Sequence, residues 1–295
     1  MRDDLPSPWD WANEHDPPAD LSEVLERADG LWESGRSNDA ITLLDEAIQH
    51  ADVSGDLDDE SVLALHLARA RRLGEASRFT DLLEACRQSI DFAWERSLAR
   101  SHLAALAVIL HALTLAEIGR KTESMVELDE IAETFGHEDD PALRAVAASA
   151  LRYKARELAE VRSLDDGEEA LATLTSCYGS DVAPAVRAEA ALGMAELAIY
   201  FIQAGKRRRA LRLASQMLAR YEGSRDADIR AALAVAYVSK IHILPRQGRL
   251  IAAIRCILAF VRFVGTDPEP KVVQAVLSHH PKGEKLLRHA ATFNS

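Results

Sequence analysis

Apolar and small residues recur along this chain with helical spacing, in paired segments that are separated by short turns. Six segments place an apolar residue four positions before a glycine or a polar substitute. The intervals between successive turn residues are 42, 42, 43, 43 and 43 residues. This regularity predicts a series of helix hairpins, one in each repeat. The turn residues are Gly35, Ser77, Gly119, Arg162, Gly205 and Gly248.

Small residues flank each turn at fixed distances. Seven residues before the turn the chain carries alanine in five repeats and Ile241 in the last, and a small residue or leucine follows five residues after most turns. Small side chains let two helices approach closely, and glycine supplies the left-handed cap of the first helix. In the fourth repeat the matching pair is Ala170-Leu171, eight residues past the turn, so we expect about three inserted residues near 164–166.

The ends of the second helices follow the same spacing. They are expected at Gly136, Gly179, Gly223 and Gly265. Acidic N-caps then open the next helices at Asp139-Asp140, at Asp181, and at Asp226 or Asp228. Because a single hairpin cannot bury its apolar face, neighbouring hairpins must stack into a solenoid.

These patterns resemble the tetratricopeptide-repeat (TPR) superfamily. The signature appears in Ala28, Gly35 and Asp39-Ala40-Ile41, and the segment Asp140-Pro141-Ala142-Leu143-Arg144 is similar to the repeat openings of bacterial arrays with long repeats. The resemblance covers residues 20–265 and implies a right-handed α-solenoid of about six TPR-like hairpins whose first helices line a concave groove. Residues 1–19 are expected to form a disordered or extended tail, and residues 266–295 a short helical cap.

Composition agrees with an all-α protein. The 295 residues include only 14 Gly and 10 Pro, too few for the frequent turns of a β-sandwich or barrel. The chain has no apolar run of membrane-spanning length, and its start does not read as a secretory signal. We therefore expect a cytoplasmic protein in which Cys86, Cys177 and Cys256 are reduced and buried.

No catalytic, metal-binding or cofactor-binding motif is present, so the sequence favours a non-enzymatic scaffold or adaptor that binds a peptide or a partner helix. His66 and His111 are expected as core or groove residues with satisfied nitrogens. The resemblance implies that the groove contains Trp32, Arg71, Arg152, Arg156, Gln203, His242 and Arg246.

Three arginines, Arg144, Arg187 and Arg230, are spaced by 43 residues. Stacked repeats would align these guanidinium groups. The row could pair with the capping acids between repeats, or it could present a strip to an anion. Loss of stability in a triple alanine variant would support the first alternative, and loss of binding without loss of stability the second.

Charge is distributed unevenly around a net value of −12. Residues 1–200 carry 18 basic and 41 acidic residues, whereas residues 201–295 carry 17 and 6. A basic run at the start of the fifth repeat either pairs with a neighbouring acidic element or binds an anionic partner. The second interpretation gives the alternative function, a regulatory module that binds an anionic partner, such as an acidic protein or nucleic acid, through its basic C-terminal third. Nucleic acid is disfavoured because aromatic residues are not interleaved, and head-to-tail self-association is a further interpretation. The run comprises Lys206, Arg207, Arg208, Arg209 and Arg212.

Two tryptophans, Trp9 and Trp11, lie in the proline- and aspartate-rich N-terminal segment. They either belong to a disordered tail or dock into a groove of this chain or of a neighbour.

Overall fold

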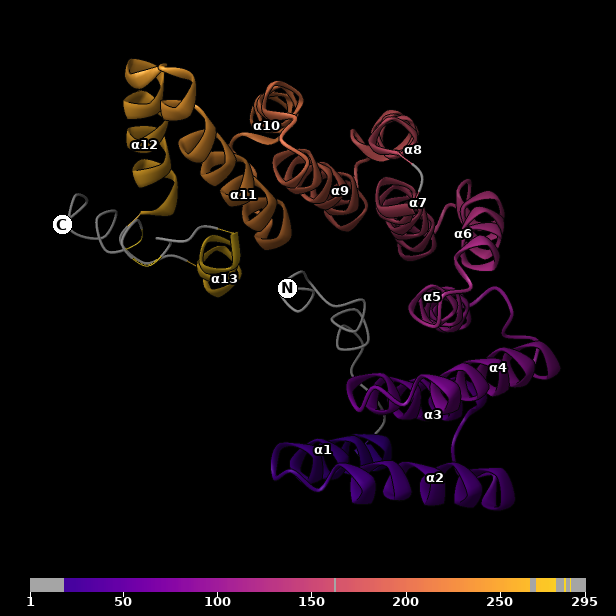
Figure 1. The fold of residues 1–295 in the computed structure, drawn as a ribbon. Helices are drawn as coiled ribbons and strands as arrows, with labels where there is room; N and C mark the ends of the chain where they lie inside the picture. The colour runs from indigo at the N-terminus through magenta and orange to yellow at the C-terminus, as the bar shows by residue number, and fades with distance from the viewer. Residues whose placement is uncertain (1–18, 162, 266–268, 280–283, 285–286, 288–295) are drawn as a thin grey trace. The chain divides into compact units, whose positions relative to one another are not determined.

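The structure is a computed structural model that describes residues 19–161, 163–265, 269–279, 284 and 287. The described residues form helices and connecting turns and contain no β-strand, which confirms the predicted all-α class (Figure 1). They divide into two compact units between Ala150 and Leu151, within α7. We call these the N-terminal unit and the C-terminal unit. No helix in the described ranges is both long and apolar enough to cross a membrane.

Odd-numbered helices from α1 to α11 are the first helices of the hairpins, and even-numbered helices from α2 to α12 are the second helices. The elements are α1 (Ala19–Glu33), α2 (Ser37–Ser54), α3 (Asp59–Glu75), α4 (Phe79–Glu95), α5 (His102–Glu117), α6 (Lys121–Phe135), α7 (Pro141–Val161), α8 (Leu164–Tyr178), α9 (Pro184–Gln203), α10 (Arg207–Tyr221), α11 (Ala227–Ile243), the 3-10 turn η2 (Pro245–Gln247), α12 (Leu250–Val264) and α13 (Pro270–His279).

A shared backbone turn closes the hairpins. Ser77 adopts the left-handed conformation with φ of +56°, although it carries a side chain. The residue after each left-handed position donates its N–H to a carbonyl five residues earlier, as in Arg36 N to Leu31 O at 2.9 Å and Lys206 N to Phe201 O at 2.7 Å. In the fourth hairpin Ser163 N donates to Leu158 O at 3.2 Å, while Arg162 lies outside the described residues. The left-handed turn residues are Gly35, Ser77, Gly119, Gly205 and Gly248.

Small side chains line the contact between the two helices of a hairpin. Ala28, Ala70, Ala112, Ala155 and Ala198 are all buried on the first helices, and Ala40, Ser124, Ala210 and Ala253 are buried on the second.

The expected insertion in the fourth repeat is wrong. The α8 helix begins at Leu164, two residues past position 162, as the other second helices do relative to their turns. Buried Gly167 occupies the position five residues past the turn, where a Cβ would lie 2.8 Å from Ala159 Cβ and 2.9 Å from Ala155 O. Glycine is therefore the small residue that permits close approach of α7 and α8.

Acidic side chains cap two of the later first helices. Asp140 accepts from Ala142 N at 2.8 Å at the start of α7, and Asp226 accepts from Ile229 N at 2.9 Å at the start of α11. The expected cap at Asp181 is wrong: Asp181 accepts from Ala183 N at 2.8 Å, but Ala183 is itself the N-cap of α9 and has no capping side chain. At the ends of second helices, Gly136 and Gly179 keep right-handed backbone angles, and only some of these glycines serve as left-handed caps.

The last hairpin differs from the others because proline interrupts its first helix. Pro245 follows the end of α11 and begins η2, so the helix stops at Ile243 as the missing N–H of proline requires. The α13 helix then packs against α11 and buries Val272 and Val276. Trp9 and Trp11 lie outside the described residues.

Candidate functional site

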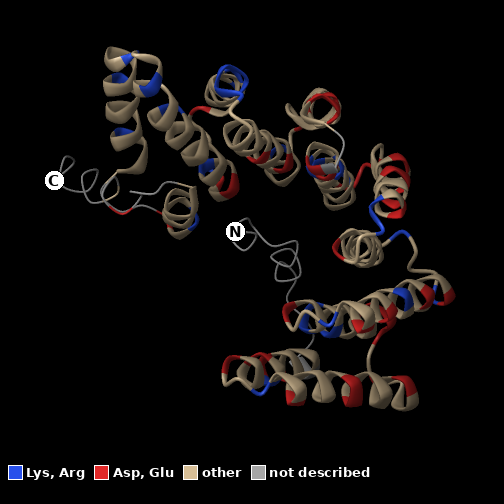
Figure 2. Ribbon diagram, in the orientation of Figure 1, with Lys and Arg blue, Asp and Glu red and all other residues tan. Residues whose placement is uncertain are grey.

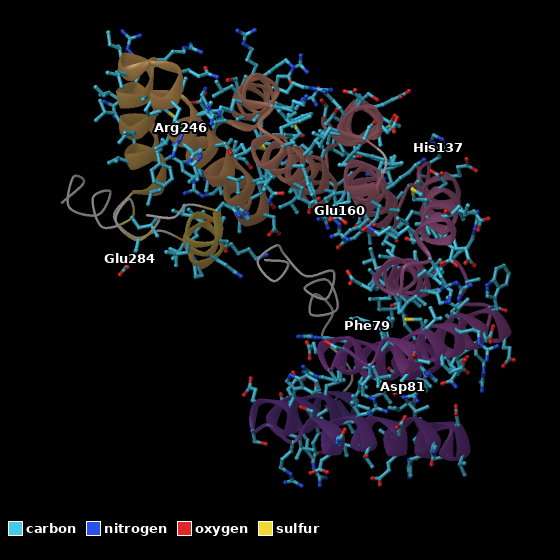
Figure 3. The ribbon with its side chains drawn as sticks, in the orientation of Figure 1. Phe79, Asp81, His137, Glu160, Arg246 and Glu284 are labelled. Atoms are coloured by element: carbon cyan, nitrogen blue, oxygen red, sulfur yellow. The ribbon has the colours of Figure 1, made fainter. Side chains whose placement is uncertain are left out.

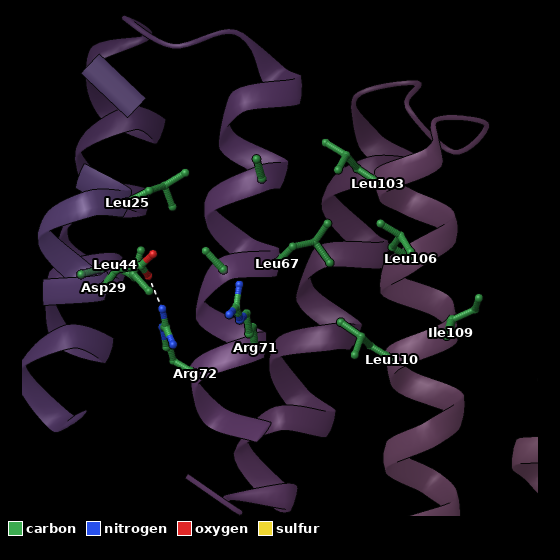
Figure 4. Close-up of a pocket in the computed structure, with 13 residues that line it drawn as sticks. Leu25, Asp29, Leu44, Leu67, Arg71, Arg72, Leu103, Leu106, Ile109 and Leu110 are labelled. Atoms are coloured by element: carbon green, nitrogen blue, oxygen red, sulfur yellow. Dashed lines mark hydrogen bonds and ion pairs between the residues drawn. The ribbon is translucent and has the colours of Figure 1, made fainter. Parts of the chain in front are cut away.

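A pocket of about 110 Å³ lies in the N-terminal unit between first helices α1, α3 and α5 (Figure 4). Its wall is apolar because leucines and Ile109 surround the small residues Ala28, Ala64 and Ala68. Ala64, Ala68 and Leu25 remain partly exposed, so the pocket opens to solvent. The lining residues are Leu25, Ala28, Asp29, Leu44, Ala64, Leu67, Ala68, Arg71, Arg72, Leu103, Leu106, Ile109 and Leu110.

Charged residues form one side of this pocket. Arg72 is buried and pairs with both Asp29 and Glu75, and its guanidinium lies 5.0 Å from the centroid of the Trp32 ring. Arg71 Nε lies 3.0 Å from Glu75 Oε1 and keeps about a quarter of its side chain exposed. The geometry thus provides an apolar cavity beside a fixed network of two guanidinium and two carboxylate groups.

Two of the predicted groove residues belong to this region. Arg71 lines the pocket, and Trp32 supports its charged side by packing on Arg72. Asp29, Arg72 and the leucines of α5 were not identified from the sequence. The available signal was the pair Ala64 and Ala68, which are four residues apart on α3 and therefore on one helix face.

Arg152 is not a groove residue, and its assignment from the sequence is wrong. Its side chain is 2% exposed, and Nε lies 2.6 Å from Oε2 of Glu189, while Nη1 contacts Glu196. Burial alone would lower the pKa of Arg152, but the two carboxylates outweigh it and hold the pKa well above its usual range. Gly193 lies between the two glutamates on α9, where an added Cβ would lie 3.0 Å from Leu174 Cδ2 and 3.2 Å from Leu171 Cδ1, so glycine favours close packing of α9 against α8.

The remaining predicted groove residues are scattered over the C-terminal unit. Arg156 is partly exposed and stacks 4.8 Å from the Tyr153 ring centroid. Gln203 is exposed at the end of α9, and His242 is half-buried. Arg246 is exposed in η2, where its Nη1 donates to His242 O at 2.7 Å (Figure 3). Burial and the nearby Arg246 and Arg207 lower the pKa of His242. The pocket between α1, α3 and α5 contains none of these four side chains.

Two of the three spaced arginines bind the backbone that precedes their own helix, and the third binds a later segment of the chain. Arg144 Nη1 donates to Asp139 O at 2.7 Å, and Arg187 Nη1 donates to Val182 O at 2.8 Å. Arg230 Nε lies 2.9 Å from Glu269 Oε1. These contacts support the structural alternative, since the guanidinium groups hold linkers and a following segment in place.

The basic run at the start of α10, blue in Figure 2, divides into two groups by its ion pairs. Arg209 Nη1 lies 2.5 Å from Asp165 Oδ1, and Arg212 Nη2 lies 2.6 Å from Glu168 Oε1, so both arginines pair with the acidic start of α8. Lys206, Arg207 and Arg208 are exposed and form no ion pair within the described part of the chain.

Histidine and cysteine environments differ from the expectations in two places. His66 is buried against Phe92, but its Nδ1 has no hydrogen-bond partner, whereas His111 Nδ1 lies 2.8 Å from Glu127 Oε2. Cys177 is exposed, while Cys86 and Cys256 are buried. Burial raises the pKa of Cys86 to about 12 and that of Cys256 to about 11, which makes both thiols poor nucleophiles. The described residues contain no cluster of His, Cys, Asp and Glu suited to a metal ion.

No family model and no curated protein matches the sequence. A tetratricopeptide repeat protein from Parabacteroides merdae ATCC 43184, solved by crystallography, aligns with 93% of this chain and 90% of its own, at 14% identity and a TM-score of 0.44. The helices of the chain form tandem TPR-like hairpins with a period of 42 to 43 residues.

Proposed function

We propose that this protein is a non-enzymatic interaction module, and that the pocket between α1, α3 and α5 binds an aliphatic side chain of a partner peptide or helix. The observation that carries the proposal is an open apolar cavity next to a fixed charged network on the first helices. Apolar pockets with a few convergent polar groups are the usual form of a binding site.

The size of the pocket supports this choice of ligand. A buried cavity of about 150 Å³ is large enough to bind benzene, so 110 Å³ suits one aliphatic side chain. Burying such a side chain contributes about 1.5–3 kcal/mol, which corresponds to at least about tenfold in Kd. Arg71, partly exposed at the same pocket, is placed to orient the partner's main chain or a carboxylate.

A displayed library of random 16-residue peptides tests the proposal. We expect selected peptides to share one leucine, isoleucine or methionine anchor, and we expect Ala68→Leu, which fills the pocket, to weaken their binding at least tenfold in fluorescence anisotropy. Ala219→Leu is the matched control, because Ala219 is exposed on α10. Thermal melts of both variants check the fold. Peptides that bind Ala68→Leu as tightly as the parent protein would contradict the proposal.

A further inference from the structure

The second helix of the last hairpin carries an exposed apolar stripe. Leu250, Ile251, Ile254 and Leu258 of α12 are 62%, 70%, 57% and 38% exposed. At 100° per residue these side chains fall within one arc of the helix surface. The opposite face of α12 is buried through Cys256, Phe260 and Val264, so the helix is apolar on both sides. A helix of this kind is normally covered on both faces.

Repeat positions identify what normally covers such a stripe. Ile254 lies six residues past Gly248, and its counterpart six residues past Gly205 is Leu211, which is buried in α10. The α10 helix is followed by another hairpin, whereas α13, the helix described after α12, packs against α11. The exposure of Ile254 therefore marks the end of the array, where the next second helix would lie.

The N-terminal end of the array has the complementary gap. Leu43 of α2 lies eight residues past Gly35, and its counterpart in α10, Leu213, is buried. Leu43 itself is half-buried and packs against the core of the first hairpins, and no second helix among the described residues precedes α2. Asp39, Glu46 and His50 share the face of α2 that contains Leu43.

The two ends of the array carry opposite charge. Residues 19–54 contain nine acidic and two basic residues, whereas residues 229–265 contain six basic residues and no acidic one (Figure 2). Arg249, which precedes α12, and Arg255 and Arg262 within it are exposed and form no ion pair with any part of the chain that the structure describes. Opposite charges at the rim of an apolar contact favour association and fix its orientation.

One contact within the C-terminal unit shows how second helices meet. Asp165 and Glu168, three and six residues past position 162, pair with Arg209 and Arg212, four and seven residues past Gly205. In the same register, Ile251 and Ile254 of α12 would meet Asp39 and Thr42 of an α2 helix, next to Leu43.

We propose that the α12 face of one copy of this protein docks onto the α2 face of a second copy, which continues the hairpin array from chain to chain. The contact is heterologous, because each copy uses a different surface, so it generates chains or closed rings rather than a simple two-fold dimer. Ile251, Ile254 and Leu258 would become buried, and Arg255, opposite Leu43 in this register, would lie within one helical turn of Asp39 and Glu46.

Sedimentation equilibrium of the full chain tests this proposal from about 1 to 200 µM. We expect the average mass to rise with concentration in dilute salt and to fall in about 0.5 M salt, where the Debye length drops to about 4–5 Å. A protein that stays monomeric over the whole range in dilute salt would overturn the proposal.

Two blocked variants test the orientation of the contact. Ile254→Asp removes the α12 face, and Leu43→Asp removes the α2 face, so each variant alone should be monomeric while an equimolar mixture forms a dimer and no larger species. Ala219→Asp on exposed α10 is the control and should associate like the parent. A mixture that stays monomeric refutes the head-to-tail contact.

A charge reversal tests the ion pairs of the proposed contact, and lipid vesicles test whether the apolar stripe binds a membrane instead. Arg255→Glu should weaken association at least fivefold, and the addition of Glu46→Arg should restore it. If Ile254→Asp abolishes binding to phosphatidylserine vesicles while the parent protein remains monomeric, the stripe binds lipid and the proposal is wrong. The outcome is independent of the α1, α3 and α5 pocket, because none of these substitutions alters a residue that lines it.

Discussion

The Nε atom of Arg152 lies 2.6 Å from Oε2 of Glu189, and both side chains are buried. Glu196 contacts the same guanidinium from the next turns of α9. Burial raises the pKa of Glu189, and Arg152 opposes this effect by stabilising the carboxylate. The ion cluster therefore holds α7 and α9 together only while every partner is present.

Removing the arginine alone should destabilise the protein strongly. Arg152→Met leaves two buried carboxylates without the guanidinium that pairs with them, and we expect a loss of about 3–5 kcal/mol in unfolding free energy by urea denaturation. Arg36→Ala breaks an exposed pair with Asp39 and should cost less than about 1 kcal/mol. Equal losses of unfolding free energy in the two variants would show that the buried ion cluster stabilises the protein no more than an exposed ion pair does. Replacing Glu189 and Glu196 by leucine together with Arg152→Met should recover most of the lost stability.

The left-handed turns predict opposite effects for two substitutions. Ser77 has φ of +56°, so Ser77→Gly relieves backbone strain and should stabilise the protein by about 0.5 kcal/mol. Gly119 has φ of +87°, and Gly119→Ala should destabilise it by about 1 kcal/mol. Thermal melts of both variants measure the two effects, and a lower melting temperature for Ser77→Gly would contradict the assignment of strain.

Arg208 and Arg209 are neighbours with different roles. Arg209 pairs with Asp165 and Glu168 and lies 4.7 Å from the Phe201 ring centroid, so Arg209→Ala should lower stability by about 1 kcal/mol. Arg208 is exposed, and Arg208→Ala should change stability by less than about 0.5 kcal/mol. Chemical denaturation measures the unfolding free energy of both variants. Equal values would show that the ion pairs of Arg209 do not contribute to stability.

His66 should make stability depend on pH. Burial lowers its pKa and outweighs the opposing effect of Asp52 and Asp45 on α2, while Arg69 acts in the same direction as burial. The unfolded chain therefore takes up a proton near the ordinary pKa of 6.5, at which folded His66 remains neutral. Stability is fully present above that pH and falls as the pH decreases below it, with a slope of up to about 1.4 kcal/mol per pH unit.

Urea denaturation between pH 7.5 and 5 measures this slope. His66→Leu should flatten it, and His50→Gln, at an exposed site on α2, is the control. An unchanged slope in His66→Leu would assign the pH dependence to other groups.

The regular parts of the fold were predictable because they depend on local sequence. Glycine turns and small residues recur at fixed intervals, and their backbone consequences are the same in each hairpin. The fourth repeat was misaligned because Gly167 replaces the usual alanine, and Glu168 occupies a position that is apolar in other repeats. Glu168 is compensated by Arg209 and Arg212, more than 40 residues away, which a local pattern cannot reveal.

The candidate site was only partly predictable for a similar reason. Repeat position placed Arg152 on the groove, but Glu189 and Glu196 lie 37 and 44 residues later and hold its guanidinium inside the fold. The pocket depends on space left by Ala64 and Ala68 between α1 and α5, and that space follows from packing rather than from any single motif.

The hairpin turns close through main-chain hydrogen bonds, from Arg36 N to Leu31 O in the first repeat to Arg249 N to Leu244 O in the last. The side chains of the residues that directly follow these turns are therefore not needed to close the hairpin. Lys206, Arg207 and Arg208 occupy such positions, and of their counterparts in the last hairpin Arg249 is also basic whereas Leu250 and Ile251 are apolar. Substitutions at the first positions of the second helices can therefore change the surface charge and the exposed apolar area, and with them the choice of partner, without changing the fold.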